Sequence, residues 1–228
     1  MIPEAASPLR LALLSAELVV NLVELTPECK QRIDAKLSSG NALSIPIQAS
    51  ELLAFSTPSN QKENSTPSVA LSASTRMISI FWVAENAMLG SLSENPVYFQ
   101  NLKLKKLRVN YGSKIQERLF SFDNDDRNAK LGYSQSLNAL GGGADLAFIE
   151  LDTWVDRRCI HCFDVTSSTL VGKCLQIRPN AETSHKSLSI NYEFAEMLTQ
   201  SYQLIMITDK DKSLLINPDY SLELIDTA

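Results

Sequence analysis

The C-terminal part of the chain alternates short apolar segments with polar turns, and this pattern constrains the fold more than any other feature. The segments are 162–166, 187–196, 202–208 and 213–225. Short segments of this kind, bounded by turn residues, are typical of antiparallel strands. None of them contains a catalytic motif. We therefore interpret this region as scaffold, the closing half of an antiparallel sandwich.

The middle of the chain continues the strand pattern. Residues 75–84 place apolar side chains on both faces of a predicted strand, as expected when a strand is covered on both sides. In 102–111 the apolar alternation changes parity after Leu104, and an extra residue at Lys105 or Lys106 would realign it, which predicts a β-bulge. Further strands are predicted at 42–48, 146–155 and 158–166.

Helices interrupt this pattern in two places. Thr26 and Pro27 form a helix-start signal, and the helix is expected to run to Leu37 and to stop at Gly40. Residues 123–140 look mostly helical and are followed by three glycines. Strands do not alternate with helices in βαβ order. The chain is therefore predicted to be all-β, a sandwich or barrel with one or two short inserted helices.

No break in composition marks a domain boundary. One domain is expected over 11–228, after a flexible N-terminal arm at 1–10. Within the domain, 56–68 contains no aliphatic or aromatic side chain and is predicted to be a mobile surface loop. Residues 112–145 are predicted to form a loop and helix insertion on the rim of the sandwich.

Composition narrows the class of protein. The 228 residues carry a net charge of −5, which argues against a general nucleic-acid surface. Four cysteines are too few for a disulfide scaffold, so a reducing compartment is expected. Residues 9–25 come nearest to a membrane span, but Arg10, Glu17 and Glu24 interrupt them. Leucine and alanine there favour a helix, valine favours a strand, and both stay open. A soluble intracellular protein is expected.

Cysteine and histidine supply one tempting motif. Cys159 and Cys162 flank His161 with the spacing of a metal or redox site. On a strand, however, side chains three residues apart face opposite sides, so the pair could not chelate one ion without a turn. We interpret both as structural cysteines. The other histidine, His185, lies in a polar turn, and neither histidine has a nucleophile motif. No enzyme activity, cofactor or metal is predicted.

The best basic patch lies on the bulged strand and the turn that follows it. It consists of Lys103, Lys105, Lys106, Arg108 and Lys114. Strand alternation and the bulge distribute these side chains over more than one face. A solubilised strand is the simpler interpretation, and weak contact with nucleic-acid phosphates is the alternative.

The order of the segments resembles a known family. The strand SAELVVNLVEL precedes Thr-Pro and a short helix, and MISIFWVAENAMLGSL precedes Asn95-Pro96-Val97-Tyr98-Phe99. The segments FDVT, SLSINYEFA, YQLIMIT and LLINPDYSLEL then follow. This series, over most of 12–226, resembles the C-terminal jelly roll of the double-jelly-roll major capsid proteins, most closely those of Polinton/Maverick-type elements and related viruses. A complete member carries two jelly rolls, and nothing here represents the first.

The resemblance implies a fold, a role and partners. The fold is an antiparallel β-sandwich, a single jelly roll of about eight strands. The role is that of a structural capsid protein or capsid-derived module, located in the virion, which builds trimers or shells with itself or other capsid subunits. Contacts are expected at the loops and insertion, where exposed apolar residues would mark them: Leu119, Phe120, Phe122 and Leu140. The alternative is a non-viral or domesticated binding module for a protein or glycan, with exposed aromatics on a concave face.

Overall fold

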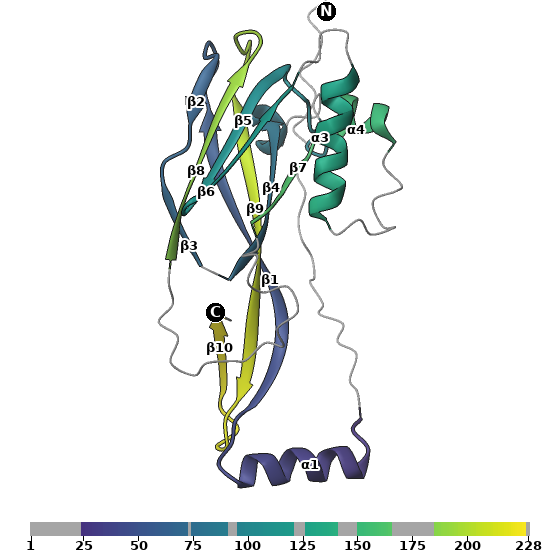
Figure 1. Ribbon diagram of the computed structural model, residues 1–228, viewed down its shortest axis with the longest axis vertical. Coiled ribbons are helices and arrows are strands. Elements are labelled where there is room, and N and C mark those ends of the chain that lie inside the picture. Colours follow the sequence, from purple (N-terminus) through teal and green to yellow (C-terminus); the bar gives the residue numbers. More distant parts are fainter. Residues whose placement is uncertain are drawn as a thin grey trace, which may run out of the picture.

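The computed structural model describes residues 24–72, 74–90, 95–120, 126–140, 150–165 and 185–226. Two antiparallel sheets of five strands each form a sandwich (Figure 1). The first sheet contains β1 (Leu43–Thr57), β4 (Thr75–Ala84), β7 (His161–Asp164), β9 (Tyr202–Ile216) and β10 (Leu222–Asp226). The second contains β2 (Glu63–Ser65), β3 (Val69–Ser72), β5 (Leu104–Tyr111), β6 (Lys114–Leu119) and β8 (His185–Phe194).

The strand order identifies the type of sandwich. β2 and β3 both pair with β8, so they act as one interrupted strand. The eight strands can then be numbered in chain order. In the first sheet, β1-β9-β4-β7, the order of neighbouring strands is 1, 8, 3 and 6. In the second sheet, β2/β3-β8-β5-β6, the order is 2, 7, 4 and 5. This is the order of a jelly roll, in which eight strands form two packed sheets. The predicted all-β antiparallel sandwich of about eight strands is confirmed, and β10 adds a hairpin to β9.

The core lies between the two sheets and is rich in aromatic side chains. β4 begins and ends where the alternation predicted, and its Ile78, Ile80 and Trp82 are almost fully buried. The Trp82 ring meets the rings of Tyr192 and Phe194 on β8 edge-on, with centroids 5.4 and 5.7 Å apart. Edge-to-face contacts of this kind stabilise a core beyond the burial of area alone. Trp82 is therefore one of the residues that hold the second sheet to the first.

The predicted β-bulge is present on β5. Leu104 lies opposite Phe194 on β8, and Lys106 lies opposite the next residue, Glu193, so Lys105 is the extra residue. Leu104 and Leu107 are consequently both fully buried although their spacing is odd. The bulge thus reconciles two apolar runs of opposite parity on one strand.

Four helices accompany the sheets in the described residues, where one or two were expected. They are α1 (Pro27–Ser38), α2 (Glu85–Met88), α3 (Asp126–Ala139) and α4 (Leu151–Arg157). α1 confirms the predicted start, because Thr26 Oγ1 accepts a hydrogen bond of 3.4 Å from the Cys29 amide. Gly40 follows it with φ +78°, as the predicted stop required. None of the described helices is both long and apolar enough to cross a bilayer.

The prediction of a strand at 146–155 is wrong for the residues of this segment that the structure describes. Residues 146–149 lie outside the described residues, and α4 begins at Leu151. Trp154 explains the difference, because the helix buries this single large ring against the Tyr133 ring of α3, with centroids 5.8 Å apart. Its indole N–H donates to the Ile160 carbonyl at 3.1 Å. Two helical turns are too short for apolar periodicity to distinguish them from a strand.

Two other predicted segments have more regular structure than their sequences suggested. The segment 56–68 contains the end of β1 and all of β2. Two of its polar side chains form hydrogen bonds with β8. Thr57 Oγ1 lies 2.9 Å from the Tyr192 hydroxyl, and Thr66 Oγ1 accepts a hydrogen bond from the Ile190 amide at 3.0 Å. The predicted insertion at 112–145 contains β6 and α3. The predicted arm at 1–10 lies outside the described residues.

Candidate interaction surfaces

The cysteine and histidine motif is buried, with His161 on the side of β7 that faces the core and Cys162 on the opposite side. Cys159 precedes β7, with its Sγ 3.4 Å from His161 Nε2, and Cys162 Sγ lies 3.4 Å from Ser79 Oγ. Both thiols are free and buried. Three aromatic rings surround the imidazole, those of Trp82, Phe120 and Trp154. No group of three or more metal-ligating side chains occurs in the part of the chain that is described.

Burial sets the ionisation of this cluster. Desolvation raises the pKa of the Cys159 thiol and that of Cys162. Desolvation, followed by the nearby charge of Arg118, lowers the pKa of His161 to about 3. Thiols held protonated are poor nucleophiles and poor metal ligands. The chemistry of the cluster is therefore that of core packing, with His161 neutral at ordinary pH.

Alkylation with iodoacetamide at neutral pH is expected to separate the cysteines by accessibility. Cys29 is exposed on α1, so its peptide is expected to be labelled within minutes. Cys159 and Cys162 are expected to remain unlabelled until denaturant is added, because the thiolate form is suppressed and buried. Peptide mass spectrometry measures each site in one sample. Equal labelling of Cys29 and Cys162 without denaturant would contradict this arrangement.

A buried arginine ties α3 to the sandwich. The Arg118 guanidinium lies 3.9 Å from the centroid of the Phe163 ring and donates to Ser136 Oγ of α3 at 3.0 Å. It also donates to the Cys162 carbonyl. Burial lowers the pKa of Arg118 to about 10, so the group stays charged at neutral pH. The hydroxyl and carbonyl dipoles and the face of the ring stabilise the positive charge of Arg118. The same contacts hold α3 against β6 and β7.

The four predicted contact residues differ in their exposure to solvent. Leu119 is 60 % exposed, as a contact residue requires. Phe120 is only 5 % exposed, so its prediction as an exposed contact was wrong. The reason is strand alternation: Phe120 points inward from the end of β6 and packs against Gly132 of α3, where a Cβ would lie 2.5 Å from the ring. Phe122 lies outside the described residues. Leu140 is partly buried beside a cleft of about 360 Å³.

The predicted basic residues are matched by acidic and polar partners. Lys103 pairs with Glu196 at 2.6 Å, Lys105 with Glu193 at 2.5 Å, and Lys106 with Glu117 at 3.1 Å. Arg108 donates to Asn110 and Lys114 to the Val165 carbonyl. The hydrogen bond with Glu193 raises the pKa of Lys105, and the same bond lowers that of Glu193. Carboxylates pair with three of the five cations, which weakens the case for phosphate contact.

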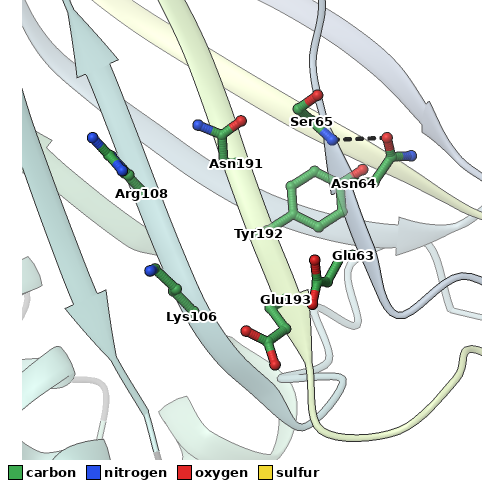
Figure 2. A pocket seen from close by; sticks show the side chains of 8 residues that line it. All are labelled: Glu63, Asn64, Ser65, Lys106, Arg108, Asn191, Tyr192 and Glu193. Carbon is green, nitrogen blue, oxygen red and sulfur yellow. Dashed lines mark hydrogen bonds between the residues drawn. The ribbon is translucent and has the colours of Figure 1, made fainter.

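The outer face of the second sheet contains a shallow polar groove of about 560 Å³ (Figure 2). Lys106 and Arg108 of β5 line one side, and Glu63 of β2 and Glu193 of β8 lie toward one end. Both signs of charge are present in the groove. A polar, open surface of this kind suits contact with another protein better than enclosure of a small molecule.

Sequence reasoning missed an apolar surface at the end of the sandwich farthest from α1 (Figure 1). Backbone hydrogen bonds join its loops: Asn60 N to Leu198 O at 2.9 Å, and Glu85 N to Ser201 O at 3.2 Å. The loops expose four large apolar side chains, which we call the loop-end patch: Met88 (51 %), Leu89 (80 %), Val97 (60 %) and Met197 (67 %). The sequence feature that could have revealed this patch was the presence of methionine and leucine within predicted turns.

Comparison with known proteins identifies the fold. No family model and no curated protein sequence matches the chain. The cryo-EM structure of the Sputnik virophage contains a chain that matches with a TM-score of 0.50 at 13 % identity, over 81 % of this chain and 39 % of that chain. The chain has a capsid-type jelly-roll fold. At this identity the likeness concerns the fold alone.

Two further viral structures match this capsid-type jelly roll at lower scores. The mavirus major capsid protein gives a TM-score of 0.45 at 11 % identity, over 82 % of this chain and 42 % of that chain. A PBCV-1 protein fitted into a Sputnik reconstruction gives 0.47 at 12 % identity, over 88 % and 54 %. The chain thus spans less than two thirds of the length of each of these proteins.

Proposed function

We propose that this chain is a structural capsid subunit, or a capsid-derived jelly-roll module, that assembles with itself or with other capsid subunits and catalyses no reaction. The observation that carries the proposal is the strand order of its two sheets, together with the fold match to a chain of the Sputnik virophage. A jelly roll pairs most of its strand edges internally, which leaves loops and sandwich sides for contact with neighbours. Trimers and a location in the virion belong to this proposal.

The loop-end patch supports an assembly role. Its four side chains are each at least half exposed. A backbone hydrogen bond joins the loops of Leu89 and Met197, and Tyr202 Oη donates to Gln100 Oε1 in the loop of Val97. Exposed apolar residues gathered in one place mark protein contacts more often than isolated ones do. We propose this patch, together with exposed Leu119 on β6, as the contact surface.

The burial of both tryptophans favours assembly over glycan recognition. A glycan-binding module needs aromatic rings open to solvent on a concave face. Trp82 and Trp154 are only 1 % and 3 % exposed, and both pack against other rings. Neither tryptophan can therefore serve as a sugar platform.

Acidic substitution in the loop-end patch is expected to weaken self-association. The double variant Leu89→Asp, Met197→Asp places two charges in an apolar contact, and we expect the dissociation constant to rise by at least about tenfold. Sedimentation equilibrium over a concentration series measures it. Leu131→Asp is the matched control, because Leu131 is 53 % exposed on α3 and is not one of the four patch residues. Unchanged association of the double variant would exclude the patch as the contact.

A further inference from the structure

β1 is by far the longest border strand of either sheet in the part of the chain that the structure describes. It runs alongside β9 over all of its fifteen residues, and β9 is its one strand partner there (Figure 1). The other border strands are much shorter: β7 has four residues, β6 six, β10 five, and β2 and β3 three and four. Eight of the fifteen residues of β1 are exposed. A long open border of this kind is a template for pairing with another strand.

The opposite border of the first sheet, β7, is capped by side chains. Lys114, Gln116 and Arg118 of β6 each donate a hydrogen bond to a backbone carbonyl in β7 or directly after it. Ser136 of α3 accepts a further one from the backbone of β7. For β1 no such cap occurs among the described residues, where its backbone hydrogen bonds are those of the ladder with β9. The two borders of the sheet are therefore treated differently, and β1 is the open one.

The hydrogen bonds of β9 show which amides of β1 face the open side. Asp211 N donates to Ser74 O at 3.2 Å and Asn217 N donates to Ser221 O at 2.9 Å, both on the side of β9 that pairs with β4 and β10. Hydrogen-bonded and non-hydrogen-bonded pairs alternate in an antiparallel ladder, so the even-numbered residues of β9 bond to β1. Their partners in β1 are odd-numbered. The amides of the even-numbered residues of β1 therefore point away from the sheet.

Two prolines delimit these outward amides. Pro46 lies at an even-numbered position, where its missing N–H removes no bond with β9, and Pro58 directly follows the strand. Between the prolines, the residues with outward amides are Gln48, Ser50, Leu52, Ala54 and Ser56. This set is symmetric about Leu52, so a second copy of the same segment, turned by 180°, presents the same donors and acceptors in the opposite direction.

We propose that β1 pairs with β1 of a second copy of this chain, antiparallel and about a two-fold axis at Leu52. The inference rests on the proposed assembly role and adds a contact to that of the loop-end patch. Every outward amide between the prolines then has a partner: Gln48 pairs with Ser56 of the second copy, Ser50 with Ala54, and Leu52 with Leu52. The first sheets of the two copies become one continuous sheet, joined by an interface in which both copies use the same residues.

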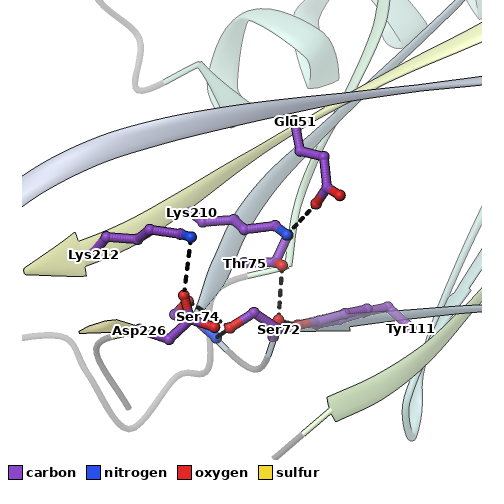
Figure 3. A network of polar contacts seen from close by, with 8 residues as sticks. All are labelled: Glu51, Ser72, Ser74, Thr75, Tyr111, Lys210, Lys212 and Asp226. Carbon is purple, nitrogen blue, oxygen red and sulfur yellow. Dashed lines mark hydrogen bonds and ion pairs between the residues drawn. The ribbon is translucent and has the colours of Figure 1, made fainter. Parts of the chain in front are cut away.

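The side chains at this border suit a contact of the strand with itself. Leu53 packs against the core, so its neighbour Leu52 points to the outer face of the sheet, where it is 61 % exposed. In the proposed register Leu52 meets Leu52 of the second copy. Glu51 is the one charged residue between the prolines, and Lys210 of β9 forms an ion pair with it (Figure 3). The contact thus joins two apolar side chains and brings no unpaired charge together, which favours a second copy over a charged strand of another protein.

Exchange of charge at position 52 tests the two-fold register. The test uses the Leu89→Asp, Met197→Asp background, which removes the contribution of the loop-end patch, and sedimentation velocity over a concentration series measures the mass. Dimers are expected in this background. Leu52→Lys and Leu52→Asp are each expected to raise the dissociation constant of the dimer by at least about tenfold, because like charges then oppose each other at the axis. An equimolar mixture of the two is expected to restore dimers, because opposite charges then meet.

Ile115 supplies the matched control, because it is 59 % exposed on β6, another border strand. Ile115→Lys and Ile115→Asp are expected to leave the dimer unchanged. Monomers in the patch background, when the unmodified protein still assembles, would overturn the pairing, leave the assembly role intact and assign the open border to a strand of another protein. Dimers that persist in both position-52 variants, or a mixture that stays monomeric, would overturn it too. An unmodified protein that is monomeric at every concentration would overturn both proposals.

Hydrogen exchange in the same background follows the backbone of β1 itself. The amides of 48–56 that face the open side are expected to exchange at least about tenfold more slowly in concentrated than in dilute protein, because the second copy protects them. The amides of β6 are expected to exchange at the same rate in both samples. Exchange of 48–56 that does not depend on concentration, in samples that contain dimers, would place the contact elsewhere and contradict the pairing.

Discussion

Replacement of Trp82 by alanine is expected to lower the free energy of unfolding by about 3–5 kcal/mol. Trp82 is 1 % exposed and lies between the sheets, where its ring meets those of Tyr192 and Phe194. Its removal opens a cavity at the contact that joins β4 to β8, and the remaining rings cannot fill it. Urea denaturation followed by circular dichroism measures the change.

The control for this prediction is a large apolar residue that contributes no core packing. Leu89→Ala is expected to change the free energy of unfolding by less than about 0.5 kcal/mol, because Leu89 is 80 % exposed. A loss below about 1 kcal/mol for Trp82→Ala would mean that the two sheets are not held together by this ring.

Acidification is expected to destabilise the fold through His161. The pKa of His161 is about 3 in the folded chain, against an ordinary value of 6.5, so the unfolded chain binds this proton first. Its contribution to stability is complete above pH 6.5 and is lost as the pH falls from 6.5 toward 3. At about pH 5 the loss from this one residue is about 2 kcal/mol, because one pKa unit corresponds to about 1.36 kcal/mol.

The surroundings of His161 explain the size of this effect. The charged Arg118 of β6 faces it, and the Cys159 thiol, held neutral by burial, contacts its Nε2. Its Nδ1 has no hydrogen-bond partner among the described residues. Trp82, Phe120 and Trp154 complete the enclosure, so an imidazolium has no compensating anion.

Urea denaturation at a series of pH values between 5 and 7.5 measures the dependence on His161. His161→Phe is expected to flatten the pH dependence, since the group that titrates is removed while the ring packing is kept. His185→Gln is the matched control, because His185 is exposed at the start of β8. An equal pH slope in His161→Phe and in the unmodified protein would assign the acid sensitivity to other groups.

Much of the sandwich could be predicted from local patterns. Thr75–Ala84 is an almost continuous apolar run because both faces of β4 are covered, and the strand boundaries follow. The parity change after Leu104 revealed the bulge, since only an extra residue can place Leu104 and Leu107 on one face. Thr26 and Gly40 marked the limits of α1 through capping chemistry and positive φ.

The errors arose where tertiary contacts outweigh local pattern. α4 forms because Trp154 finds a site against α3 and the Ile160 carbonyl, and a seven-residue segment contains no signal of such a partner. Phe120 was expected at the surface because it lies in the predicted 112–145 insertion, yet it packs between α3 and His161. The loop-end patch escaped notice because an apolar residue in a turn gives no indication of its exposure.

Electron microscopy of the concentrated protein tests the central claim most directly. If the capsid-type jelly roll is a structural building block, particles in the size range of trimers or larger, or closed shells, are expected at high concentration, and the Leu89→Asp, Met197→Asp variant should reduce them. Mass photometry of the same samples counts the subunits in each particle. Strict monomers at every concentration, with or without the two substitutions, would contradict the assembly role.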